Sequence, residues 1–121
     1  MDRATNQHDE HGKLVQDILL ALGQRPDVFL WRNPTGHYLA LDGVTHVVVG
    51  IKGAPDIMGV KSCGGVGRAF GIEAKTGSGR VRKRQSIWRA AFEKRHGIYI
   101  VARSVIQAVS AINAMEPVRA S

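Results

Sequence analysis

The sequence has a single cysteine, Cys63, among its 121 residues. One cysteine cannot form a disulfide bond within the chain, and it excludes zinc and iron–sulfur sites that are built from several cysteines. A catalytic role for Cys63 is also disfavoured, because a cysteine in a glycine-rich turn is usually incidental. The chemistry of this protein therefore has to come from other side chains.

The chain also lacks a long apolar run and an apolar segment at its start. The first absence predicts no membrane span, and the second predicts no signal peptide, since Met1–Asn6 are mostly polar. We therefore expect a cytoplasmic protein that does not contact a membrane. Its length fits one domain, which we place at residues 9–115 between flexible ends at 1–8 and 116–121.

Acidic residues are scarce, with 10 Asp and Glu against 17 Lys and Arg, which gives a formal net charge of +7. A basic surplus fits a polyanionic partner, because cations that neutralise phosphates release bound counterions. A ribosomal or structural protein would have the same surplus, so charge alone does not define the partner.

Apolar periodicity predicts helices and strands along the chain. Leu14, Ile18 and Leu22 recur every four residues and predict a first helix from about residue 9. Aromatic and β-branched residues predict a strand at 28–32, with Trp31 in the core. Short strands at 38–41 and 46–49, a helix at 82–96, a strand at 98–101 and a helix capped by Ser104 follow. The predicted fold class is α/β, with a mixed sheet flanked by helices.

One stretch in the middle of the chain organises the rest. Asp56 opens one apolar run, Glu73 and Lys75 close the next, and a segment of turn composition lies between them at 62–67. We predict two antiparallel strands joined by a loop over this segment. Side chains alternate along a strand, so Glu73 and Lys75 share one face while Ala74 points into the core. The hairpin then brings Asp56 close to Glu73 and Lys75.

The predicted cluster contains two carboxylates and a lysine. Two carboxylates a few ångströms apart form a hard-oxygen site suited to Mg²⁺ or Mn²⁺. Such an ion polarises a phosphate and lowers the pKa of a bound water. A lysine beside the carboxylates orients that water or neutralises charge that develops on phosphorus. The arrangement therefore predicts metal-dependent chemistry on a phosphate.

The spacing of Pro55-Asp56 and Glu73-x-Lys75 resembles the signature of the PD-(D/E)xK nucleases. More of the chain, roughly residues 10–110, agrees in the segments Glu10, Trp31–Gly36, Gly50–Asp56, Glu73–Thr76, Gly79, Gln85 and Gly97–Val101. Together these segments resemble the VRR-NUC (virus-type replication-repair nuclease) family in its compact, standalone form. The resemblance implies a restriction-endonuclease-like core and a DNA endonuclease of phage or prophage type.

The resemblance also implies a role for each matching residue. The catalytic residues would be Asp56, Glu73, Lys75 and Gln85. The ligands of Mg²⁺ or Mn²⁺ would be Glu10, Asp56, Glu73 and the backbone carbonyl of Ala74. From the pattern alone, Glu10 is a solvated acid at the start of a helix, and only the resemblance assigns it to the metal. The contacts to DNA would come from Arg32, Asn33, Arg80, Arg82, Lys83 and Arg84.

Standalone members of the family resemble Holliday-junction resolvases and form dimers. The resemblance therefore implies branched DNA as substrate and a homodimer that presents two cutting sites. The apolar face that a dimer needs could belong to the first or the last helix. Cleavage of flaps or single strands fits the same residues.

Three other interpretations stay open at this point. A DNA-binding module without catalysis would keep Asp56 and Glu73 as solvated acids or as partners of Lys75. A sequence-specific endonuclease would need extra segments that read bases, and this chain has little length to spare. Histidines invite a metal interpretation, but isolated histidines are usually exposed or structural, which we expect of His8, His11, His37 and His46.

Overall fold

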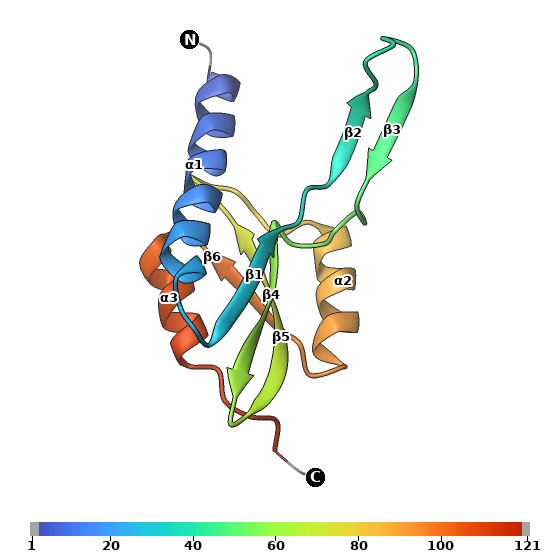
Figure 1. The fold of residues 1–121 in the computed structure, drawn as a ribbon. Coiled ribbons are helices and arrows are strands. Elements are labelled where there is room, and N and C mark those ends of the chain that lie inside the picture. Colours follow the sequence, from blue (N-terminus) through green and yellow to red (C-terminus); the bar gives the residue numbers. More distant parts are fainter. Residues whose placement is uncertain (1–2, 120–121) are drawn as a thin grey trace.

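The computed structural model describes residues 3–119, with side chains from residue 9 onward. A four-stranded sheet in the order β1-β4-β5-β6 forms the body, and a separate two-stranded ribbon, β2-β3, projects from it (Figure 1). The strands are β1 (Val28–Arg32), β2 (Gly36–Leu39), β3 (His46–Val49), β4 (Ile57–Cys63), β5 (Val66–Ala74) and β6 (Ile98–Ala102). The helices are α1 (Arg3–Gly23), α2 (Lys83–Glu93) and α3 (Val105–Asn113).

The sheet is mixed, as predicted. β1, β4 and β5 pair antiparallel, whereas β5 and β6 pair parallel, with α2 in the connection between them. The fold class predicted from the sequence, α/β with a mixed sheet flanked by helices, is confirmed. No helix in the described part of the chain is long and apolar enough to cross a membrane.

Helix α1 begins at Arg3, earlier than the predicted start near residue 9. Its buried stripe consists of Val15, Ile18 and Leu22, all fully inaccessible to solvent. Apolar periodicity detects only the part of a helix that packs on the core, so it missed the polar first turns. The predicted flexibility of the two ends stays a prediction, and residues 1–2 and 120–121 lie outside the described residues.

The β4–β5 hairpin turns over Gly64 and Gly65 alone. Both glycines have positive φ, 60° and 82°, which is the requirement of a two-residue turn of the I′ type. The loop predicted over 62–67 is therefore too long, because its outer residues pair as strand. On the core side of β5, Phe70, Ile72 and Ala74 are buried, as the alternation predicted for Ala74.

Helices cover the two faces of the sheet unequally. In Figure 1, α1 and α3 lie on one side of the sheet, and α2 lies on the other side beside β6. Trp31 was predicted to be in the core, but 44% of it is exposed, because the core-facing side of β1 carries Val28 and Leu30 instead. On the other side of the sheet the described helix, α2, packs on β6. Strand alternation showed that Phe29 and Trp31 share a face, and it could not show which face is covered.

Candidate active site

The register of the central hairpin brings two acids together. Ile57 pairs with Ile72, so Asp56 and Glu73, the next residues along each strand, lie opposite one another at the same edge of the sheet. Lys75 follows directly after β5 on the same face as Glu73. The convergence of Asp56, Glu73 and Lys75 that the sequence predicted is therefore present.

Hydrogen bonds fix Asp56 from three directions. Its Oδ2 accepts the backbone N–H of Ala74 at 2.8 Å and lies 3.2 Å from Nε2 of His11. Its backbone carbonyl accepts the N–H of Asn33 at 2.8 Å, and the Asn33 side chain donates to the Pro55 carbonyl at 3.0 Å. Asn33, predicted to contact DNA, thus anchors the turn into β4 in this structure.

Glu73 is buried, with 5% of the residue exposed. Its Oε1 accepts a hydrogen bond from Nε2 of Gln85 at 2.9 Å and lies 3.7 Å from Nζ of Lys75. Lys75 in turn donates to Oε1 of Gln85 at 3.1 Å, and the same oxygen accepts the backbone N–H of Arg82 at 2.8 Å. Gln85 therefore holds the acid and the lysine in one fixed geometry.

Burial raises the pKa of Glu73 to about 7, and the nearby Asp56 carboxylate adds to this rise while Lys75 opposes it. The pKa of Tyr99 is also raised, by burial first and then by the charge of Glu73. The hydroxyl of Tyr99 is buried without a hydrogen-bond partner among the described residues. Negative charge is thus crowded at this edge of the sheet, where a cation would relieve the repulsion.

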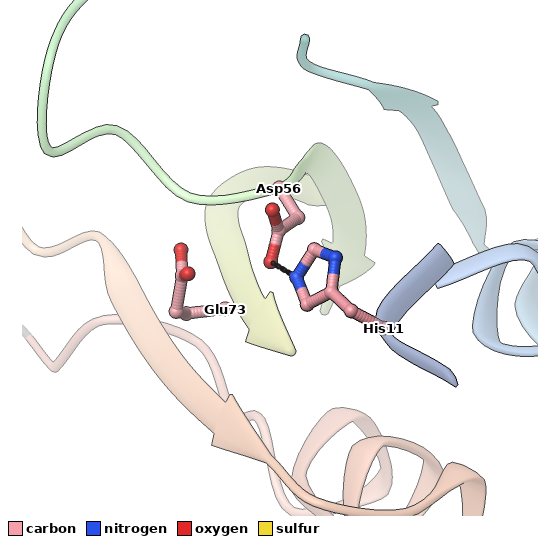
Figure 2. Close-up of side chains that lie close together, drawn as sticks. All are labelled: His11, Asp56 and Glu73. Atoms are coloured by element: carbon pink, nitrogen blue, oxygen red, sulfur yellow. Dashed lines mark hydrogen bonds and ion pairs between the residues drawn. The ribbon is translucent and has the colours of Figure 1, made fainter. Parts of the chain in front are cut away.

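Three side chains at this edge could hold a metal ion. One ligand atom each from His11, Asp56 and Glu73 lies within 4.8 Å of the others, and Figure 2 shows the three side chains converging from α1 and the hairpin. Two carboxylates suit Mg²⁺ and Mn²⁺, and an imidazole nitrogen adds a donor that transition ions prefer. The donor set therefore fits a divalent cation.

The helical member of this group is His11, whereas the resemblance pointed to Glu10. Glu10 is exposed on α1 and lies outside the group. Two apolar stripes run side by side on α1, and extending the one that contains the half-buried Leu14 backward by four residues reaches Glu10. Extending the one that contains the fully buried Val15 gives His11 instead. The signal was present in the sequence, and the structure was needed to show which of two adjacent stripes faces the sheet.

Two open hollows flank the acids. One, of about 550 Å³, has Arg82, Lys83 and Arg84 in its wall together with Asp56 and Glu73. The other, of about 420 Å³, is lined by Glu73, Lys75, Arg82, Gln85 and the loop at 76–79. Most of the cations predicted to contact DNA therefore surround the acid pair.

The loop between Lys75 and α2 is held in place by Arg103, which donates to the carbonyls of Gly77 and Gly79 at 3.1 and 2.7 Å. No pattern in the sequence pointed to Arg103. At the other side, Gly53 has a φ of 90° and packs so closely on the Arg84 carbonyl that a Cβ would collide with it. These two contacts set the position of the basic segment relative to the acids.

Several other residues that were predicted or considered have no recorded contact with the acid pair or are not described. Arg32 and Arg80 are exposed and line neither hollow. His37 and His46 lie on the ribbon, and His8 falls among the residues whose side chains are not described. Cys63 is buried at the opposite end of β4 from Asp56, which agrees with its expected lack of a catalytic role.

A solved structure described as a VRR_NUC domain is similar to this chain, with a TM-score of 0.52 and 20% sequence identity. The match covers 87% of this chain and 96% of that one. This chain has the fold of a VRR_NUC domain. The VRR-NUC resemblance inferred from the sequence is thereby confirmed at the level of the fold. No family model matches the sequence, and no curated protein matches it.

Proposed function

We propose that this protein is a metal-dependent DNA endonuclease. The observation that carries the proposal is the convergence of Asp56, Glu73 and Lys75 with Gln85 at one edge of a VRR_NUC-type sheet. Two acids beside a basic surface would repel DNA unless a cation lay between them and the phosphate. A module that only binds DNA would gain nothing from this arrangement.

We infer Mg²⁺ or Mn²⁺ as the cofactor, held by Asp56, Glu73 and His11, with the Ala74 carbonyl as a further candidate ligand. The imidazole of His11 favours Mn²⁺ over Mg²⁺, because nitrogen donors bind transition ions more strongly. When bound, such an ion polarises the scissile phosphate and lowers the pKa of a coordinated water. The residues around it supply positioning and the remaining charge.

Lys75 is placed to orient the attacking water and to stabilise negative charge on the phosphorus oxygens. Gln85 is a positioning residue, since it fixes the lysine and the acid at once. Hydrolysis forms a bond from the water oxygen to phosphorus and breaks one phosphorus–oxygen ester bond. Arg82, Lys83 and Arg84 would contact the flanking phosphates from the wall of the hollow.

The finer proposal is that the substrate is branched DNA and that the protein acts as a homodimer. Symmetric cleavage of two strands requires two sites at a fixed spacing, which a two-fold dimer supplies. The basic character of the chain supports contact with several DNA arms. Flaps and single strands are the competing substrates, and a direct comparison separates them.

The test is a cleavage panel on a four-way junction, a flap, a duplex and a single strand of matched sequence, each with Mg²⁺, Mn²⁺ or EDTA. We expect cleavage only with metal and fastest on the junction. Lys75→Ala should lower the rate by about a hundredfold to a thousandfold and leave DNA affinity unchanged. Cleavage by the variant at the wild-type rate would remove the active-site assignment, and binding without cleavage by the wild type would favour a non-catalytic module.

A further inference from the structure

The β2–β3 ribbon stands away from the rest of the protein. It begins three residues after β1 ends and continues outward from that end of the sheet (Figure 1). Apart from their pairing with each other, β2 and β3 make no extensive contact with any helix or strand that the structure describes. A two-stranded ribbon is marginally stable in water by itself. The ribbon would therefore gain stability from a surface that covers it.

The residues of the ribbon indicate what kind of surface that is. Segment 36–49 contains no Lys or Arg and one acid, Asp42, although the whole chain has a net charge of +7. Its exposed large apolar side chains are Tyr38, Leu39, Leu41, Val44, Val47 and Val48. Contacts to nucleic acid come largely from cationic side chains to phosphates, and the ribbon has none. An apolar protein surface is the partner that fits.

The same chain exposes a second apolar surface on β1 and β4. Phe29 is 72% exposed, contacts Trp31 with ring centroids 5.8 Å apart, and lies opposite Val60 in the register. Phe29, Trp31 and Val60, which we name the sheet patch, lie on the face of β1 and β4 that is turned away from the buried Val28 and Ile57. Among the described helices, α1 packs on the opposite face of β1 and α2 packs on β6. By contrast, the described side chains of α1 include one exposed large apolar residue, Leu20, and those of α3 include one, Ile106.

We propose that the ribbon of one chain docks on the sheet patch of a second copy, and that the exchange is reciprocal. The ribbon follows β1 with only residues 33–35 between them, so a two-fold axis at this junction would lay each ribbon along its partner's β1. One chain then supplies both the apolar arm and the apolar surface that covers it. Neither surface presents like charges to the other.

The docking bears on the acid site. Thr35 and Gly36, at the base of the ribbon, form part of the wall of the larger hollow beside Asp56. A ribbon fixed by a second copy would fix this wall and hold two acid sites at a set spacing. The inference rests on the proposed homodimer and names its surface, which is the ribbon and not a face of the first or last helix.

The test measures mass in solution by light scattering, without DNA or metal, so its outcome is independent of the nuclease assignment. We expect the wild type at twice the 13.2 kDa of one chain. Leu39→Glu on the ribbon and Phe29→Glu on the sheet patch should each give monomers. Matched controls are Leu20→Glu, since Leu20 is 59% exposed against 58% for Leu39, and Ile106→Glu, since Ile106 is 77% exposed. Both controls should remain dimeric.

A mixing experiment makes the proposal specific. An equimolar mixture of Leu39→Glu and Phe29→Glu chains retains one intact ribbon–patch contact per pair, so it should recover dimers that neither variant forms alone. Replacing 37–48 by an Asn-Gly turn between the paired Gly36 and Val49 gives a second ribbon variant, expected to be a folded monomer by circular dichroism. A monomeric wild type or dimeric ribbon variants would overturn the proposal. A Phe29→Glu variant that stays dimeric and binds single-stranded DNA more weakly would also overturn it, because the sheet patch would then contact nucleic acid and not a second copy.

Discussion

The β4–β5 hairpin and the β2–β3 ribbon are both antiparallel strand pairs, but their surroundings are opposite. β5 ends in five consecutive buried residues, whereas all but one of the strand residues of the ribbon are exposed. Each strand pair also carries a carboxylate whose pKa departs from its ordinary value, and the two pKa values depart in opposite directions. Burial raises the pKa of Glu73 to about 7, while hydrogen bonds from Thr45 and Val44 lower that of Asp42 to about 2.

The difference teaches that residue type alone does not create a reactive site. Asp42 accepts its hydrogen bonds in water, so its charge is already stabilised and has no need of a cation. Glu73 is largely buried beside a second acid, where its charge is unfavourable and Lys75 compensates it only in part. The proposed chemistry is therefore assigned to the buried hairpin, and the proposed association is assigned to the exposed ribbon.

The largest expected effect contrasts the two hairpins in stability. Phe70→Ala removes a fully buried ring from β5 and should lower the free energy of unfolding by about 3–5 kcal/mol. Tyr38→Ala on the ribbon should change it by less than about 0.5 kcal/mol in the dilute monomer. Urea unfolding followed by circular dichroism measures both. Equal losses would mean that the ribbon packs on its own chain.

The two aspartates give the next contrast, in metal affinity. Asp56→Asn should weaken Mn²⁺ binding by about tenfold or more, because it removes a charged ligand. Asp42→Asn, the matched change on the ribbon, should leave the affinity unchanged. His11→Ala should weaken Mn²⁺ more than Mg²⁺. Titration calorimetry reports all three, and unchanged Mn²⁺ affinity in Asp56→Asn would place the metal elsewhere.

The opposite pKa shifts predict opposite responses to pH. The pKa of Glu73 rises from 4.5 in the unfolded chain to about 7 in the folded protein, so the folded state holds this proton more tightly. The contribution of Glu73 to the free energy of unfolding is therefore fully present below about pH 4.5 and is lost as the pH rises through about 7. Glu73→Gln removes this loss of stability. In EDTA, the Tm of the variant should therefore exceed that of the wild type, and the difference should grow as the pH rises.

The matched control for this pH series is Asp42→Asn. Because the pKa of Asp42 is lowered to about 2, its stabilisation is lost only when the pH falls toward that value. The difference in Tm between wild type and Asp42→Asn should then stay constant from about pH 5 to 8. A Glu73→Gln difference that is equally flat would show that Glu73 remains ionised throughout and that the acid pair is not crowded.

The smallest expected effect concerns the basic segment, which adjoins the buried hairpin and not the ribbon. Lys83→Ala should reduce the salt dependence of DNA binding by about one unit of log–log slope, as expected for one lost phosphate contact. Lys94→Ala, just after the other end of α2, should leave the slope unchanged. Fluorescence anisotropy measured across a series of salt concentrations gives the slope for each variant. An unchanged slope in Lys83→Ala would remove this lysine from the DNA interface.

Much of the site could be predicted because it depends on local rules. Strand alternation placed Glu73 and Lys75 on one face, and a tight turn between two strands placed Asp56 opposite them. A glutamine that shares a helix stripe with Trp88 and Phe92 also needs a hydrogen-bond partner, and the structure supplies Glu73 and Lys75. Such rules act within a few residues or across one hairpin.

Other features depended on which surfaces meet in space. His11, and not Glu10, lies beside the two acids because α1 turns the stripe of Val15 toward the sheet, as its packing against β1, β5 and α3 requires. Trp31 is exposed because α1 packs on the opposite face of β1, and the ribbon is unsupported because no described helix makes extensive contact with it, which no periodicity within their own strands can reveal. The sequence by itself determined the strands, the turn and the acid pair through local geometry. Only the tertiary structure decided the third candidate ligand, the raised pKa of Glu73 and the uncovered surfaces, because burial is a property of neighbours distant in the chain.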